Sequence, residues 1–197
     1  LFPANHFYTL KDPLTTVEQI KQMKVLTVPG VDARAWGSLT TGVVTSPVVR
    51  YFDLVSKGAV DAYTSMPIFD MIALNLWKST KYIIDFKDAK NASTFAFVMN
   101  EKKWQSIAAA DQAAIEKVSG EAFADYMKGV DDATEEVIKK VTAEGVQRAA
   151  ASDAVIAAVK NASAFAESDW IAEAGKRGVD GRAALDFYRA QVQSLAK

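Results

Sequence analysis

Residues 110–143 alternate apolar and polar positions with the period of a helix, which predicts one amphipathic helix of about 34 residues, roughly 50 Å long. Its apolar positions are Ile115, Val118, Ala122, Tyr126, Val130, Ala133, Val137 and Val141. Because such a helix outruns one small domain, we expect it to connect two packed bodies. Gly120 and Gly129 lie inside it, so a division into two ordinary helices stays open.

The segment 24–67 alternates short β-branched runs with amphipathic runs, which is typical of a sheet covered by helices. The expected elements up to residue 90 are strands at 24–28, 42–45, 59–63 and 82–85 and helices at 32–40, 48–56 and 68–77. Asp32 is expected to cap the helix at 32–40. The later expected elements are a buried strand at 94–99, a short helix after Asn100, a brief strand or turn at 145–147 and helices around 153–160, 163–176 and 181–195.

The loops after Val28, Val44 and Tyr63 are expected at the edge of the sheet where open α/β sheets bind ligands. They offer aromatic surface, hydroxyl groups and one cation, a mix suited to a small polar organic molecule. The residues on this rim are Arg34, Trp36, Thr45, Ser46, Tyr63, Thr64 and Ser65. For each residue taken alone, ordinary packing or solvation is the alternative.

The composition excludes several kinds of chemistry. Lys and Arg total 23 and Asp and Glu total 24, so the bulk charge indicates no nucleic-acid or anionic-membrane partner. There is no cysteine, and His6 is the one histidine, which removes thiol catalysis and metal sites built on several histidines. We therefore expect no catalytic residues, no metal and no cofactor. An enzyme that uses His6 as a general base stays an alternative.

No apolar run reaches the roughly 20 residues that span a bilayer. The chain starts with Leu1 rather than Met, and its first apolar and aromatic residues are typical of the inside of a fold. Our hypothesis is therefore a truncated or processed fragment of a longer protein from which a signal peptide has been removed.

Four stretches together resemble the substrate-binding proteins of tripartite ATP-independent periplasmic (TRAP) transporters. The main stretch is 42–61 (GVVTSPVVRYFDLVSKGAVD), followed by Pro67, which looks like that family's strand, its helix ending in Leu-x-x-Gly-x-Val-Asp-Gly and a nearby proline. The others, in the same order as in the family, are 14–25 (LTTVEQIKQMKV), 97–104 (FVMNEKKW) and 110–112 (ADQ). The order and spacing carry the match, since no single motif is specific.

The resemblance implies an α/β fold with a two-lobed, periplasmic-binding-protein-like (type II-like) architecture and a long inter-lobe helix, present here as a partial chain. Residues 1–90 and 130–197 would form the second, C-terminal lobe, and 91–129 would be a remnant of the first lobe plus the linking helix. The lobes would close around one ligand by a hinge motion. An incomplete first lobe would leave the strand at 94–99 with unpaired edges, so we expect self-association or poor order there.

The chain differs from the family at the positions that would bind the ligand. The resemblance implies an arginine that clamps a ligand carboxylate, and here Leu26 or Thr27 occupies that position. Neutral side chains cannot supply its charge, so Arg34 is the expected substitute unless the ligand differs, with a solvated Arg34 as the alternative. A second basic position corresponds to His6, and the family's asparagine falls near Ser65. The predicted ligand-binding residues are Asn5, His6, Thr27, Arg34, Trp36, Thr45, Tyr63, Ser65 and Phe69.

The function implied by the resemblance is that of a periplasmic solute-binding protein. It would capture a small organic acid between two lobes and deliver it to the membrane permease of a TRAP transporter. An alternative is a ligand-sensing or interaction module that works with a membrane receptor rather than a permease.

Overall fold

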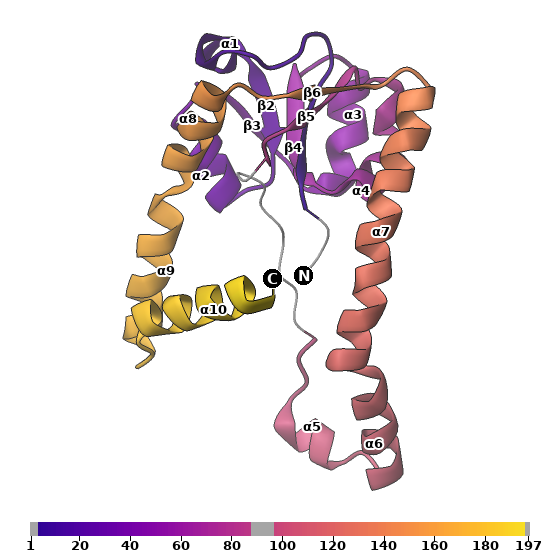
Figure 1. Cartoon of the computed structure of the whole chain (residues 1–197), viewed down its shortest axis with the longest axis vertical. Coiled ribbons are helices and arrows are strands. Elements are labelled where there is room, and N and C mark those ends of the chain that lie inside the picture. The colour runs from indigo at the N-terminus through magenta and orange to yellow at the C-terminus, as the bar shows by residue number, and fades with distance from the viewer. Residues whose placement is uncertain (1–3, 88–96, 196–197) are drawn as a thin grey trace.

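The computed structural model describes residues 4–87 and 97–195 (Figure 1). They form one six-stranded sheet with the strand order β3-β2-β4-β1-β5-β6. The strands are β1 (His6–Thr9), β2 (Lys24–Thr27), β3 (Gly42–Thr45), β4 (Ala62–Met66), β5 (Tyr82–Asp85) and β6 (Gln147–Ala150). β1 runs antiparallel to β4 and β5, whereas the other neighbouring pairs are parallel. This mixed sheet confirms the α/β class.

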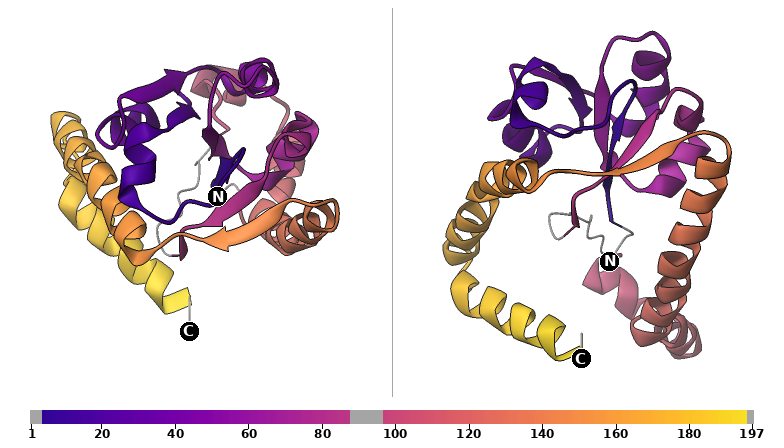
Figure 2. Two further views of the ribbon diagram at one scale, coloured as in Figure 1. Left: turned by 90° about the horizontal axis from the view of Figure 1, so that it is seen from above. Right: turned by 45° about the horizontal axis from the view of Figure 1, so that its top comes forward.

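Helices cover both faces of the sheet and extend beyond it. Within the described residues, the α-helices are α1 (Val17–Gln22), α2 (Val31–Gly37), α3 (Tyr51–Ser56), α4 (Ile68–Ala73), α5 (Glu101–Gln105), α6 (Ala109–Val118), α7 (Glu121–Ala143), α8 (Asp153–Ser163), α9 (Phe165–Lys176) and α10 (Gly181–Leu195). Two 3-10 helices are η1 (Val48–Arg50) and η2 (Leu76–Lys78). Helix α7 and the run α8 to α10 leave the sheet on opposite sides (Figures 1 and 2).

Two hydrophobic cores lie on the two faces of the sheet, because successive side chains of a strand point to opposite faces. Phe7 and Val25 pack on one face with residues of α1, α2 and α8. Tyr8 and Leu26 pack on the other face with residues of α3, α4 and the last turns of α7. The result is three layers, helix on sheet on helix.

The predicted strands are mostly confirmed. Those at 42–45 and 82–85 match β3 and β5, and the one at 24–28 matches β2 with an earlier end at Thr27. The strand predicted at 59–63 is displaced to Ala62–Met66, because the turn that closes α3 includes Gly58 at a φ of 65°. The segment 145–147 leads into β6, which pairs with β5. β1 and α1 have no counterpart among the predicted elements.

The predicted helices need local corrections. Asp32 is not a cap, since α2 has its N-cap at Gly30 and Asp32 lies in its first turn. The helix predicted at 48–56 divides into η1 and α3, and the one at 68–77 divides into α4 and η2, because Asn75 has a left-handed backbone (φ 55°). The three C-terminal helices are confirmed, with α8 longer than predicted.

The single helix predicted over 110–143 is wrong, and the alternative of two helices is confirmed. Helix α6 ends at Val118 and α7 begins at Glu121, because Gly120 has a φ of 57°, outside the helical region. Gly129 stays helical. Ile138 and Val141 near the end of α7 are buried, whereas the start of the helix extends away from the sheet (Figure 1).

The buried strand predicted at 94–99 is not found where the structure describes it. Residues 94–96 lie outside the described residues, and Phe97, Val98 and Met99 form no strand and are 95%, 89% and 52% exposed. The helix after Asn100 is confirmed as α5, with Asn100 as its N-cap. Self-association through 94–99 stays a prediction. It was based on a strand with unpaired edges, and residues 97–99 do not form a strand.

Gly42 at the start of β3 approaches the backbone of β2 closely. A Cβ at this position would lie 2.5 Å from the carbonyl oxygen of Met23. We expect Gly42→Ala to lower the free energy of unfolding by about 2 kcal/mol, because the backbone must shift. Gly37→Ala is the matched control, since no atom lies within 4 Å of its Cβ. Equal stability of the two variants in urea denaturation would contradict this close approach.

Candidate functional site

One edge of the sheet collects the ends of five parallel strands and the beginning of an antiparallel one. β2, β3, β4, β5 and β6 all end at this edge, and β1 starts there with His6, which Asn5 precedes. The loops predicted after Val28 and Val44 do meet at this edge. The third loop follows Met66 rather than Tyr63, because β4 continues further than predicted.

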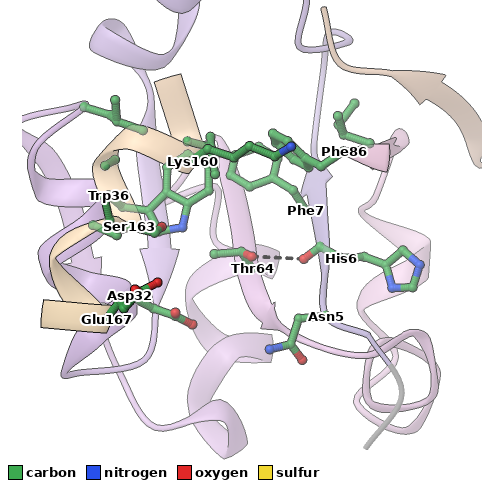
Figure 3. A pocket seen from close by; sticks show the side chains of 16 residues that line it. Asn5, His6, Phe7, Asp32, Trp36, Thr64, Phe86, Lys160, Ser163 and Glu167 are labelled. Atoms are coloured by element: carbon green, nitrogen blue, oxygen red, sulfur yellow. Dashed lines mark hydrogen bonds between the residues drawn. The ribbon is translucent and has the colours of Figure 1, made fainter. Parts of the chain in front are cut away.

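A pocket of about 360 Å³ opens at this edge between the sheet, α2 and α8 (Figure 3). Three aromatic rings form part of its wall. The ring of Phe7 lies 4.7 Å from that of Trp36 and meets the ring of Phe86 edge-on at 5.8 Å. The lining residues are Asn5, His6, Phe7, Asp32, Ala35, Trp36, Leu39, Thr64, Ile84, Phe86, Val159, Lys160, Ala162, Ser163, Ala164 and Glu167.

The start of β1 contributes polar groups to the pocket. The hydroxyl of Thr64 donates a hydrogen bond to the carbonyl oxygen of His6 at 3.0 Å. The imidazole of His6 points away from the other labelled side chains (Figure 3), and its ring lies 6.0 Å from that of Tyr8 on the opposite face of the sheet. Asn5 is buried beside this contact. His6 thus meets the pocket with its backbone rather than its ring.

Among the described residues, three charged side chains line the pocket, namely Asp32, Glu167 and Lys160. Glu167 accepts hydrogen bonds from Arg189 at 2.5 Å and from Arg182 at 2.7 Å, both on α10. These bonds hold the pKa of Glu167 below its usual range, so the carboxylate is charged at neutral pH. In Figure 3, Asp32 and Glu167 lie together, on the side of the pocket away from Phe86.

β4 leaves the regular ladder where it reaches the pocket. His6 pairs with Met66 and Tyr8 pairs with Tyr63, so two residues of β4 stand opposite one residue of β1. Ser65, one of the two, has a φ of 67°, a conformation that non-glycine residues rarely adopt. This bulge lets Thr64 reach β1 while Ser65 reaches β2.

Ser65 joins β2 to the pocket by hydrogen bonds. Its hydroxyl donates to Asp32 Oδ2 at 2.5 Å, and the Thr27 hydroxyl lies 2.8 Å from its Oγ. Because the single Ser65 proton is directed at Asp32, Thr27 is the donor to Ser65. Burial, and then the charge of Asp32, raise the pKa of Tyr51 well above its ordinary value, so its phenol stays neutral.

The structure gathers most of the predicted ligand-binding residues at this site. Asn5, His6 and Trp36 line the pocket, and Thr27 and Ser65 reach it through Asp32. Their roles toward a ligand stay predictions.

Arg34 lies outside the pocket. Its guanidinium forms an ion pair with Asp169 of α9 and lies 3.8 Å from the ring centre of Phe165. Both side chains of the pair are largely exposed, at 60% and 56%. Arg34 therefore ties α2 to α9 in this structure, which agrees with the alternative to a ligand role.

Three other predicted residues also lie away from the pocket. Thr45 is exposed at the end of β3. Tyr63 is buried in the core of the opposite face, where its hydroxyl lies 2.6 Å from that of Thr80. Phe69 packs against the same core. Their side chains serve packing or solvation here.

Several residues that line the pocket were not among the predicted ligand-binding residues. Phe86 follows the strand predicted at 82–85 directly, so its position at the end of a strand was an available signal. Lys160 and Glu167 come from helices far along the chain, and no local pattern connects them to the strand ends. Asp32 was interpreted as a helix cap because of its position at the start of a predicted helix, so it was not considered as a pocket residue.

Residues 4–87 and 97–195 were searched for clusters of metal-ligating side chains and for membrane-spanning helices. Nowhere in these ranges do three or more His, Cys, Asp or Glu side chains group as metal ligands. The helices in them are too short or too polar to cross a bilayer.

Sequence comparison identifies a family and one curated relative. Residues 4–170 match the model of the bacterial extracellular solute-binding proteins, family 7. The outer membrane transporter protein TsaT of Comamonas testosteroni is 33% identical over 190 residues, which cover 96% of this chain and 56% of that protein. The chain thus spans little more than half the length of this relative.

Solved structures with the same fold are TRAP solute-binding proteins. One from Bordetella bronchiseptica with bound (R)- and (S)-mandelate has a TM-score of 0.77 at 21% identity, over 98% of this chain and 61% of that one. One from a marine metagenome, specific for aromatic acids and in complex with metahydroxyphenylacetate, has a TM-score of 0.81 at 22% identity, over 98% and 62%. One from Rhodoferax ferrireducens with copurified benzoate has a TM-score of 0.77 at 19% identity, over 100% and 63%. The predicted resemblance and fold class are confirmed.

The bulge at Ser65 can be tested with two substitutions. Ser65→Ala and Ser65→Gly both remove the hydroxyl between Thr27 and Asp32, at a cost of about 1–2 kcal/mol. Glycine alone relieves the positive φ, so the Ser65→Gly protein should unfold with about 0.5–1 kcal/mol more free energy than Ser65→Ala. Urea denaturation measures the difference. The reverse order, which is usual at a regular strand position, would contradict the bulge.

Proposed function

Because the chain belongs to the bacterial extracellular solute-binding proteins of family 7, we propose that it binds a small organic acid in the pocket at the edge of its sheet. The family is periplasmic, as predicted from the resemblance. Its members bind solutes, which supports the expectation that this chain is not an enzyme. The chain covers 56% of its curated relative, so the activity of the whole protein is part of the proposal.

The observation that carries the proposal is the composition of the pocket. A cavity of about 150 Å³ is sufficient for benzene, so the volume of about 360 Å³ leaves room for a substituted ring. Phe7, Trp36 and Phe86 offer aromatic faces and edges. Asn5 and Thr64 add hydrogen-bonding groups. This mix favours an aromatic acid over an aliphatic one.

The solutes of similar structures support the same class. Mandelate, metahydroxyphenylacetate and benzoate are all aromatic acids. Their identity to this chain is 19–22%, so the support comes from the shared fold together with the aromatic wall of this pocket.

Lys160 is the residue that we propose as the partner of the solute carboxylate. Among the described residues that line the pocket, it alone has a cationic side chain. An ammonium on a flexible stem attracts a carboxylate as a point charge and does not need the bidentate geometry of arginine. Arg34, the substitute predicted from the sequence, is occupied by Asp169 and Phe165 outside the pocket.

The division of the chain between two lobes is also part of the proposal. Residues 1–90 and 130–197 would form the second lobe, and 91–129 a remnant of the first lobe with the linking helix. In support, the sheet and both cores draw on described residues before 88 and after 136, whereas α5 and α6 lie away from the sheet (Figure 1). The solute would favour a closed arrangement of the lobes through contacts made only there, and the closed form would be delivered to the TRAP permease.

Thermal melting of the full-length protein tests the function. A solute at 100 times its dissociation constant adds about 2.7 kcal/mol to the free energy of unfolding, so aromatic acids such as benzoate should raise the melting temperature by several degrees. A broad panel of organic acids without any such increase would contradict the proposal.

Two variants test the carboxylate partner in the same assay, followed by calorimetric titration. Lys160→Ala should weaken carboxylate binding at least tenfold, about 1.4 kcal/mol, and change the binding of the neutral amide benzamide little. Arg34→Ala is the control and should stay within about threefold of the wild type, since this salt bridge is exposed. A larger loss for Arg34→Ala than for Lys160→Ala would assign the carboxylate to Arg34 instead.

A further inference from the structure

Glu167 brings a negative charge to the pocket that is proposed to bind an acid. It lines the same pocket as Lys160, the proposed partner of the solute carboxylate. The two residues are seven positions apart, and Ala164 between them keeps a helical backbone (φ −60°, ψ −29°). Seven positions are about two helical turns, or roughly 10 Å along the axis. An unbound Glu167 carboxylate would therefore compete with the solute for the ammonium of Lys160.

Two guanidinium groups of α10 hold the Glu167 carboxylate instead. Arg182 donates a hydrogen bond to its Oε1 at 2.7 Å, and Arg189 donates one to its Oε2 at 2.5 Å. Neither arginine is among the described residues that line the pocket, so both bonds come from outside it. In Figure 3, Glu167 lies away from Lys160. Two charge-assisted bonds to one carboxylate form a network that fixes its position better than a single exposed ion pair would.

The packing of α10 on α9 brings the two arginines to Glu167. Gly181, the first residue of α10, is buried, and a Cβ at this position would lie 2.9 Å from the Cα of Ile171. Ile171 lies one turn after Glu167 on α9. Arg182 and Arg189 are seven positions apart on α10, so they share one face of that helix. The close approach of the two helices therefore presents both guanidinium groups to one carboxylate.

We propose that Arg182 and Arg189 are positioning residues of the solute site, because they hold the Glu167 carboxylate away from Lys160 and leave the ammonium available to the solute. The inference rests on the proposed function and adds to it a role for α10. Without the two guanidinium groups, Glu167 repels a carboxylate in the pocket and competes with it for Lys160. A neutral solute such as benzamide is subject to neither effect.

The expected effect is moderate because Glu167 is partly in contact with water. Its side chain is 34% exposed, so water and dissolved ions screen its charge. We therefore expect loss of the two arginines to weaken the binding of an acid about fivefold rather than abolish it, and less at high salt.

The experiment measures the binding of benzoate and benzamide by calorimetric titration of the full-length protein that carries Arg182→Gln and Arg189→Gln. This double variant should bind benzoate about fivefold more weakly at low salt and benzamide within about twofold of the wild type. Adding Glu167→Gln should restore benzoate binding to within about twofold of the wild type, because the competing charge is gone. A merely structural role of α10 would weaken both solutes and would not be rescued.

A similar group of charges on α9 provides the matched control. Glu173 pairs with Lys176 at 3.2 Å and with Arg177 at 3.1 Å, and it is not among the described residues that line the pocket. Lys176→Gln together with Arg177→Gln removes the same number of positive charges. This variant should bind benzoate within about twofold of the wild type.

The outcomes separate this inference from the function on which it rests. Unchanged benzoate binding in the double variant, an equal loss for benzoate and benzamide, or no rescue by Glu167→Gln overturns the role of the arginines and leaves acid binding intact. Failure of benzoate and other aromatic acids to bind the wild type overturns both. If the double variant shows no cooperative melting, Glu167→Gln alone decides: benzoate binding equal to the wild type or tighter supports the proposal, and weaker binding overturns it.

Discussion

The insertion of antiparallel β1 between β4 and β5 is the constraint on which the rest of the structure depends. β1 pairs with both neighbours, so it sets the position of every strand around it. Its alternation sends Phe7 to one core and Tyr8 to the other. Its first residue presents the carbonyl oxygen that Thr64 bonds. The same pairing contains the bulge that turns Ser65 toward Thr27 and Asp32, so the core and the site share one register.

Strands that a short stretch of sequence marks by itself could be predicted from the sequence. β2, β3 and β5 are runs rich in β-branched residues, and each was predicted from its own stretch of sequence. β1 is short, and its pairing joins residues more than fifty positions apart, so no local pattern marks it. The division at Gly120 was foreseeable as an alternative, because a glycine in a helix has a known cost, but its left-handed backbone was not.

The candidate site shows the same limit. Trp36 could be predicted because it belongs to the segment that follows the strand predicted at 24–28. Lys160 and Glu167 could not, because α8 and α9 lie far along the chain from the three loops predicted at the sheet edge, and α8 is brought to them by packing on α2. The sequence also offered Arg34 as the natural cation for an acid. Asp169 and Phe165 compete for it, and neither is near it in sequence.

A crystal structure of the full-length protein with a bound aromatic acid tests the location of the solute site most directly. The ring is predicted to lie against Phe7, Trp36 and Phe86, with its carboxylate near Lys160. An acid bound outside this pocket, for instance against Arg34 on the outer side of α2, would contradict the assignment.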